Sequence, residues 1–238
     1  MSAAAARPAP NGATAPLPAL PPLYRGLEPV TAQRHAGLRV RDAGFGFARE
    51  ASAVPLMAEE FVAAARSLPI VFAAQAPHLP VAVTGLAAGH SLYVEADGRW
   101  RPGAHVPAYL RRLPFLLVRA APGSDQLVLC VDPGAPQASA TEGEPLFDAE
   151  GKATPALDRA LAFCRATEEA ALRTRAMSEG LAEAGLLKPA VVQFELGGRP
   201  IRIDGFYAVE RPALMALPPE RLAELRDRGW LEAIYAHL

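Results

Sequence analysis

The chain has 238 residues, of which 51% are hydrophobic and 21% charged, and its formal net charge is −1. This composition is typical of a globular protein with one large domain or two small ones, and it excludes disorder throughout the chain. The charge gives no basic excess to attract nucleic acid or an anionic membrane surface, and no apolar run reaches the roughly eighteen residues that a membrane span needs.

The first 22 residues are rich in alanine and proline. Arg7 is their single charged residue, and six prolines interrupt any helical stretch. A secretory signal needs a basic stretch followed by an unbroken apolar core, and this segment has neither. We therefore predict a disordered tail over residues 1–22 and a single domain over residues 23–238.

The two cysteines indicate the compartment. Cys130 falls in a predicted buried strand and Cys164 in a predicted helix, and neither belongs to a CxxC pair. Two thiols are too few for a structural zinc site, which takes four ligands. We expect both to be small core residues in a reducing compartment, and we expect the protein to be cytoplasmic.

The first part of the predicted domain combines short strands with one helix. Residues 38–54 are strand-like and contain glycine bends. Residues 58–68 place apolar side chains at helical spacing, with two glutamates in the first turn, and predict a helix of about three turns. Residues 69–74 and 79–86 are short, β-rich and bounded by proline or glycine, which is typical of buried strands.

Three hairpins are predicted farther along. Residues 90–100 resemble a hairpin with an Asp-Gly turn, a pair that tolerates positive φ. Residues 114–120 and 126–132 form the arms of a second hairpin, and residues 190–196 and 200–209 form the third across a Gly-Gly connection.

Helices dominate the end of the chain. Residues 133–145 are rich in small residues and proline and predict a mobile loop. The clearest helix follows, with Pro155 at its first position and Gly185 at its end, and residues 218–238 predict one or two short helices. Because the strands come in hairpins, we predict an α+β fold, a mainly antiparallel sheet with helices packed on one side.

Signatures of common catalytic and cofactor sites are missing from the sequence. It has no Walker motif, no Gly-rich dinucleotide fingerprint and no GxSxG elbow. The five histidines show no metal-ligand spacing, so we predict no metal site and identify no cofactor; a site assembled from distant residues stays open. The carboxylate pairs Asp132 with Asp148 and Glu95 with Asp97 are more typical of turns whose side chains bond backbone N–H groups.

The segment HVPAYLRRLPF, residues 105–115, carries the candidate binding site. A short helix over residues 105–113 would place two adjacent arginines about 100° apart, away from its apolar face. Two guanidinium groups beside aromatic rings suit the recognition of a carboxylate or a phosphate. The predicted ligand-binding patch consists of Trp100, Tyr109, Arg111 and Arg112. No catalytic residue is assigned.

A structural role is the alternative for the two arginines. Their aliphatic stems would then cover the helix, while the guanidinium groups stay in water or pair with acidic neighbours such as Asp97 or Asp132. Apart from Lys152 and Lys188, arginine supplies all the basic side chains, so a single arginine is weak evidence for a site. Both roles stay open at this point.

Several long blocks of the sequence resemble the SapC family. They follow the order and spacing of that family and cover about residues 24–238. The blocks are FAREASAVPLMAEEFVAAARSLPIVFAA, GLAAGHSLYVEADGRWRPGAHVPAYLRRLPF, LCVD, LFDAEGKAT and GFYAVERPALMAL. One departure is Met57, where the family usually has a threonine that caps the following helix; Glu60, the other half of this capping box, is present.

The resemblance implies a function in a cell-surface pathway. SapC proteins are named after a surface-layer gene cluster and are linked to the export or assembly of surface proteins. We therefore expect a soluble accessory or binding protein that recognises an acidic or peptide ligand, with a protein or peptide partner from a surface or transport system. The alternative is an enzyme, metal-dependent or not, that modifies peptides or small aromatic metabolites, because family members also occur in gene clusters with outer-membrane receptors and flavin-dependent halogenases.

Overall fold

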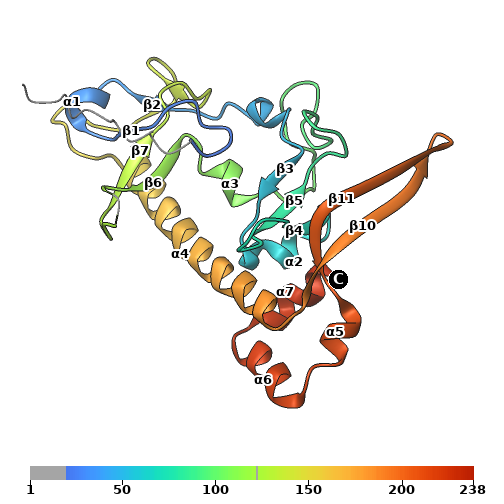
Figure 1. The fold of residues 1–238 in the computed structure, drawn as a ribbon. Helices are drawn as coiled ribbons and strands as arrows, with labels where there is room; N and C mark the ends of the chain where they lie inside the picture. The colour runs from blue at the N-terminus through green and yellow to red at the C-terminus, as the bar shows by residue number, and fades with distance from the viewer. Residues whose placement is uncertain (1–19, 122) are drawn as a thin grey trace, which may run out of the picture.

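The fold comes from a computed structural model that describes residues 20–121 and 123–238. Most of the predicted tail, residues 1–19, lies outside the described residues. Every strand pairing found in the described residues is antiparallel, and helices lie beside the sheets (Figure 1). The α+β class that the hairpins predicted is therefore confirmed.

The strands form three small sheets. The first has the order β1 (Glu28–Pro29), β7 (Leu127–Val131), β6 (Phe115–Arg119). The second has the order β10 (Leu187–Leu196), β11 (Arg199–Val209), β4 (Ile70–Ala73), β5 (Pro80–Val83), β3 (Ala53–Pro55). The third has the order β8 (Ala138–Ser139), β2 (Arg39–Val40), β9 (Glu144–Pro145). The hairpins predicted from residues 114–132 and 190–209 are confirmed as β6–β7 and β10–β11.

Most helices are short. The α-helices are α1 (Ala32–His35), α2 (Phe61–Ala64), α3 (Ala108–Arg111), α4 (Pro155–Glu183), α5 (Arg211–Met215), α6 (Pro219–Asp227) and α7 (Trp230–His237), and the 3-10 turns are η1 (Gly46–Ala48) and η2 (Ala58–Glu60). None of the helices in the described ranges has both the length and the apolar character of a membrane span.

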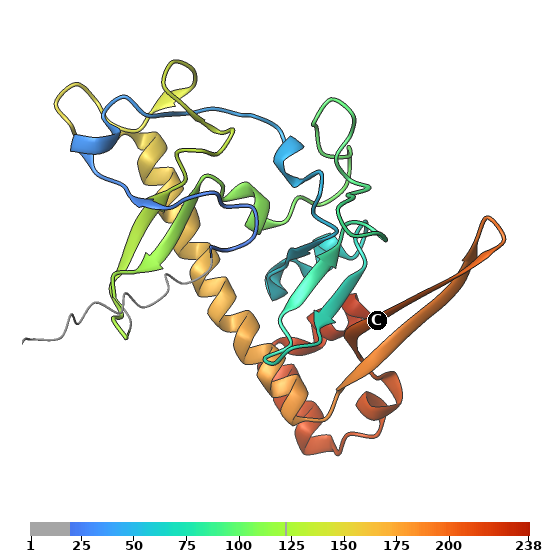
Figure 2. The same cartoon turned by 45° about the horizontal axis from the view of Figure 1, so that its top comes forward.

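The long helix α4 extends from the first sheet to the C-terminal helices. It packs against β6 near its start and reaches the group of α5, α6 and α7 at its end (Figures 1 and 2). Its bounds agree with the prediction: Pro155 is its first residue, and Gly185, at a φ of +70°, follows its end. A left-handed conformation of this kind suits glycine and ends the helix.

Three apolar clusters fill the spaces beside α4. One joins α2 and β4 to the end of α4 and to α7. A second surrounds Trp100, Tyr109 and Leu110. The third lies between β6, β7 and the first turns of α4, and it includes Phe115 and Cys164. The segment with the two adjacent arginines therefore lies between the second and third clusters.

Several segments differ from their predicted form. Of the strand-like residues 38–54, only β2 and the start of β3 are strands, and η1 lies between them. The helix predicted over residues 58–68 is divided into the 3-10 turn η2 and the single turn α2. The chain leaves the helix because Ser67 is held by other segments: its carbonyl accepts from the Tyr93 hydroxyl and its hydroxyl accepts from the His105 N–H. The predicted loop 133–145 contains the short strands β8 and β9, which pair with both sides of β2.

Candidate ligand-binding site

The single turn α3 positions the predicted arginines. Pro107 precedes it with an extended conformation, and α3 is shorter than the helix predicted over residues 105–113. Tyr109 and Leu110 are 4% and 1% exposed, so they fix the turn in the core. Arg111 is the last residue of α3 and Arg112 follows it, so both arginines come directly after the buried residues of this turn.

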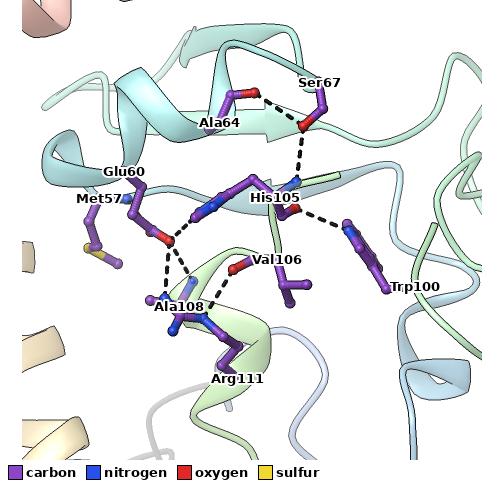
Figure 3. Close-up of polar contacts among 9 residues, drawn as sticks. All are labelled: Met57, Glu60, Ala64, Ser67, Trp100, His105, Val106, Ala108 and Arg111. Atoms are coloured by element: carbon purple, nitrogen blue, oxygen red, sulfur yellow. Dashed lines mark hydrogen bonds and ion pairs between the residues drawn. The ribbon is translucent and has the colours of Figure 1, made fainter. Parts of the chain in front are cut away.

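A buried carboxylate, that of Glu60, connects η2 to the α3 segment (Figure 3). Its Oε2 accepts a hydrogen bond of 3.0 Å from the Met57 N–H. Its Oε1 accepts from the Ala108 N–H and from His105 Nε2, both at 2.8 Å. A terminal nitrogen of Arg111 lies 3.7 Å from the same oxygen. Glu60 therefore offsets part of the Arg111 charge and holds the start of α3 in place.

Trp100 lies on the other side of this segment. Its indole N–H donates to the His105 carbonyl at 3.1 Å (Figure 3). Its ring stacks on Tyr93 with 5.6 Å between centroids. The side chain is buried, with 7% exposed. It supports the backbone at His105, and it does not line the cavity that the two arginines share.

Arg111 is half exposed and held at three points. Its Nε donates to the Val106 carbonyl at 3.1 Å, and its guanidinium carbon lies 5.1 Å from the ring centroid of Phe163 on α4. The third contact is the one to Glu60. Arg111 thus connects α3 to α4.

Arg112 is half-buried and sits between two tyrosines. Its guanidinium carbon lies 4.3 Å from the ring centroid of Tyr109 and 5.8 Å from that of Tyr24, and its Nε donates to the Tyr24 hydroxyl at 3.1 Å. Burial raises the pKa of both tyrosines, so neither supplies a negative charge at neutral pH. Among the described residues, no carboxylate lies within 4.0 Å of this guanidinium group.

A cavity of about 270 Å³ lies between α3, α4, β2 and β9, and both arginines line it. Its other lining residues are Val40, Leu113, Phe115, Glu144, Ala156, Arg159, Ala160 and Phe163. One terminal nitrogen of Arg159 donates to both carboxylate oxygens of Glu144, at 2.8 and 2.7 Å. The site therefore combines an apolar wall with three guanidinium groups and one carboxylate.

The acidic neighbours proposed for the two arginines have other partners. Asp97 pairs with Nε of Arg99 at 2.6 Å. Asp132 is buried and accepts from the N–H groups of Arg25 and Gly134. Asp148 likewise accepts two backbone N–H groups within its own turn. These aspartates are structural turn residues, as their residue type suggested.

The described residues contain no group of three or more His, Cys, Asp or Glu arranged as metal ligands. Both cysteines are buried and free. Burial raises the pKa of Cys164 to about 11, so this thiol stays protonated at neutral pH.

Part of the site was not identified from the sequence. Phe163, Arg159, Ala156 and Ala160 come from α4 and meet α3 only in the folded chain. Their spacing of three and four residues puts them on one helical face. This spacing is the only sign of the site that the sequence of α4 carries. Glu60 was noted as half of a capping box, but its bonds to the α3 segment join residues 45 or more positions apart.

The model of the SapC family matches residues 30–238. The chain belongs to the SapC family. The SapC match includes all the residues that line the cavity, together with Glu60 and His105, whereas Tyr24 lies ahead of it. No curated protein and no solved structure matches the chain.

Proposed function

We propose that this SapC-family protein is a binding protein that recognises an acidic group, on a small molecule or a peptide, in the cavity between α3 and α4. The supporting observation is the half-buried guanidinium group of Arg112, which faces the cavity and has no carboxylate within 4.0 Å among the described residues. A charged group that is partly removed from water without an opposite charge carries a desolvation cost, and a bound anion would offset it.

The surroundings of Arg112 suit such a role. The rings of Tyr24 and Tyr109 and the bond to the Tyr24 hydroxyl hold the guanidinium group in one orientation before any ligand arrives. A pre-oriented group loses less conformational entropy on binding. Arg111 lines the same cavity, so a second guanidinium group lies near the first.

Membership of the SapC family supports a proposed cellular role. We place the protein in the cytoplasm as an accessory factor of a cell-surface or surface-layer pathway, with an acidic or peptide ligand from a protein of that pathway or from an associated transport system.

A titration of the purified protein tests this proposal. Benzoate and phenyl phosphate serve as probes, and isothermal titration calorimetry measures the affinity of each. We expect at least one probe to bind in a one-to-one ratio, and we expect Arg112→Gln to weaken binding at least tenfold, about 1.4 kcal/mol. Arg119→Gln is the control, because Arg119 is exposed and pairs with Asp125 away from the cavity. Failure of both probes to bind, or unchanged affinity in the Arg112 variant, would refute the proposal.

A further inference from the structure

We infer that the ligand group that enters this cavity is an apolar monocarboxylate, and that Glu144 excludes groups with a second negative charge. The inference rests on the proposed function and adds the ligand class and a specificity-determining residue. Two sources share this chemistry: a free aliphatic or aromatic carboxylic acid, and the carboxyl-terminal residue of a peptide with an apolar side chain.

The balance of charge around the cavity points to one negative charge. Both oxygens of Glu144 accept from Arg159, so this guanidinium group is already matched. Arg111 lies 3.7 Å from the buried carboxylate of Glu60, whose negative charge offsets part of the positive charge of Arg111. Arg112 is the guanidinium group of the cavity that has no such partner among the described residues. One carboxylate would therefore complete the charge balance.

A second negative charge would meet Glu144. This residue lies opposite Val40 in the pairing of β9 with β2, so the third sheet fixes its backbone at the cavity wall. A dianion at Arg112 would bring its second charge into a space of about 270 Å³ that already contains the Glu144 carboxylate. Because both oxygens of Glu144 already accept from Arg159, a second negative charge would find the Glu144 carboxylate and no unmatched guanidinium group in the cavity.

The walls of the cavity favour an apolar group next to the carboxylate. Six of its ten lining residues are apolar: Val40, Leu113, Phe115, Ala156, Ala160 and Phe163. A volume of about 270 Å³ corresponds to roughly nine water molecules and lies just below the range of about 300–1,000 Å³ that is usual for drug-sized ligands. A benzoate-sized group or one amino-acid residue fits this space.

The experiment compares a monoanion with a dianion of similar shape. Benzoate and phenyl phosphate are titrated into the whole protein at pH 8, where phenyl phosphate carries two charges because the second pKa of a phosphate ester is about 6. We expect benzoate to bind the unmodified protein at least tenfold more tightly. In Glu144→Gln the charge of Arg159 is released, and we expect this preference to fall at least tenfold or to reverse. Glu142→Gln is the matched control, because Glu142 is exposed, pairs with Arg41 and does not line the cavity.

A second variant covers the case in which Glu144→Gln does not fold. Arg159→Gln leaves Glu144 without its partner, so we expect it to weaken benzoate binding severalfold. Equal or tighter binding of phenyl phosphate to the unmodified protein would overturn the inference and leave the proposed function intact. Binding of neither probe would overturn both.

The two sources are separated by a peptide pair. Ala-Ala-Phe with a free carboxylate and its carboxyl-terminal amide are titrated under the same conditions. Tighter binding of the free peptide than of benzoate supports a protein carboxyl terminus as the source, and binding of benzoate alone supports a small acid. Equal binding of the peptide and its amide would contradict the requirement for a carboxylate.

Discussion

The guanidinium carbon of Arg112 lies 4.3 Å from the centroid of the Tyr109 ring, while the ring itself is buried beneath it. The tyrosine hydroxyl donates to the Pro22 carbonyl at 2.6 Å, so the ring cannot turn away. The arginine thus rests on a fixed aromatic surface at the wall of the cavity. Arg112 therefore contributes to stability through this contact and to ligand binding through its guanidinium group. Unfolding experiments measure the first contribution and ligand titrations measure the second.

We expect Arg112→Gln to lower the free energy of unfolding by only about 1 kcal/mol, because a partly exposed cation–π contact contributes about 0.5–2 kcal/mol. Urea unfolding measures this loss, and Arg119→Gln, an exposed arginine paired with Asp125, should change stability by less than about 0.5 kcal/mol. A loss above about 3 kcal/mol would mean that Arg112 is mainly structural.

Glu60 should contribute far more to stability than its neighbour Glu59. Replacing Glu60 by alanine leaves the N–H groups of Met57 and Ala108 and the ring of His105 without their acceptor in a buried region. We expect a loss on the order of 3 kcal/mol, measured by urea unfolding. Glu59→Ala removes an exposed pair with Arg173 and should cost less than about 1 kcal/mol. Similar losses in the two variants would contradict the role assigned to Glu60.

Replacing Gly180 by alanine should lower stability, although this change inside a helix usually raises it. Alanine inside a helix is normally more favourable than glycine by about 1 kcal/mol. A Cβ atom at residue 180 would clash with Cζ3 of Trp230, so Gly180→Ala should instead destabilise the protein by about 1–3 kcal/mol.

Two further variants test the cause. In a Trp230→Ala background the same change should become neutral or stabilising, because the clash is gone. Gly37→Ala, where no atom lies within 4 Å of the added Cβ, should have little effect in thermal unfolding. Destabilisation by Gly180→Ala that persists without the tryptophan would rule out the clash as its cause.

His237 should make the protein less stable in acid. The Val209 N–H donates to its Nε2 and its Nδ1 donates to the Ile70 carbonyl, both at 3.0 Å, so the folded state requires the neutral ring. Burial lowers the pKa of His237 below its usual 6.5. The unfolded chain then binds more protons, and stability that is complete above about pH 6.5 falls as the pH decreases below it.

Urea unfolding between pH 8 and pH 5 checks this dependence. We expect His237→Gln to be less stable than the unmodified protein at pH 8 and the difference to narrow towards pH 5. His90→Gln, at an exposed position, should follow the unmodified protein. A difference that stays constant over the whole range would show that His237 does not titrate in this way.

The elements that the sequence predicted well are those whose pattern is local. The helix α4 has proline at its start and glycine beyond its end, and the hairpin β10–β11 has a Gly-Gly turn between alternating apolar residues. The helix over residues 58–68 was predicted too long because contacts of Ser67 with Tyr93 and His105, more than 25 residues away, end it early. The short strands β8 and β9 were not predicted, because a two-residue strand is defined by its partner, β2, rather than by its own residues.

In the candidate site, too, the sequence predicted only the residues that are close together in the chain. The pair Arg111 and Arg112 was visible because the two residues are adjacent in an otherwise apolar segment. Glu144, Arg159 and Phe163 join them only through the packing of α4 and β9 around α3, which no local pattern encodes. Trp100 was grouped with the arginines by its nearness in sequence, whereas its ring packs on the opposite side of the His105 backbone.

The central claim is that Arg112 holds the acidic group of the ligand. A crystal structure of the protein soaked with benzoate tests it most directly. We expect a benzoate in the cavity with its carboxylate about 2.7–2.9 Å from a terminal nitrogen of Arg112 and its ring against Phe163. A benzoate bound elsewhere, or a cavity filled by Arg112 paired with a protein carboxylate, would contradict it.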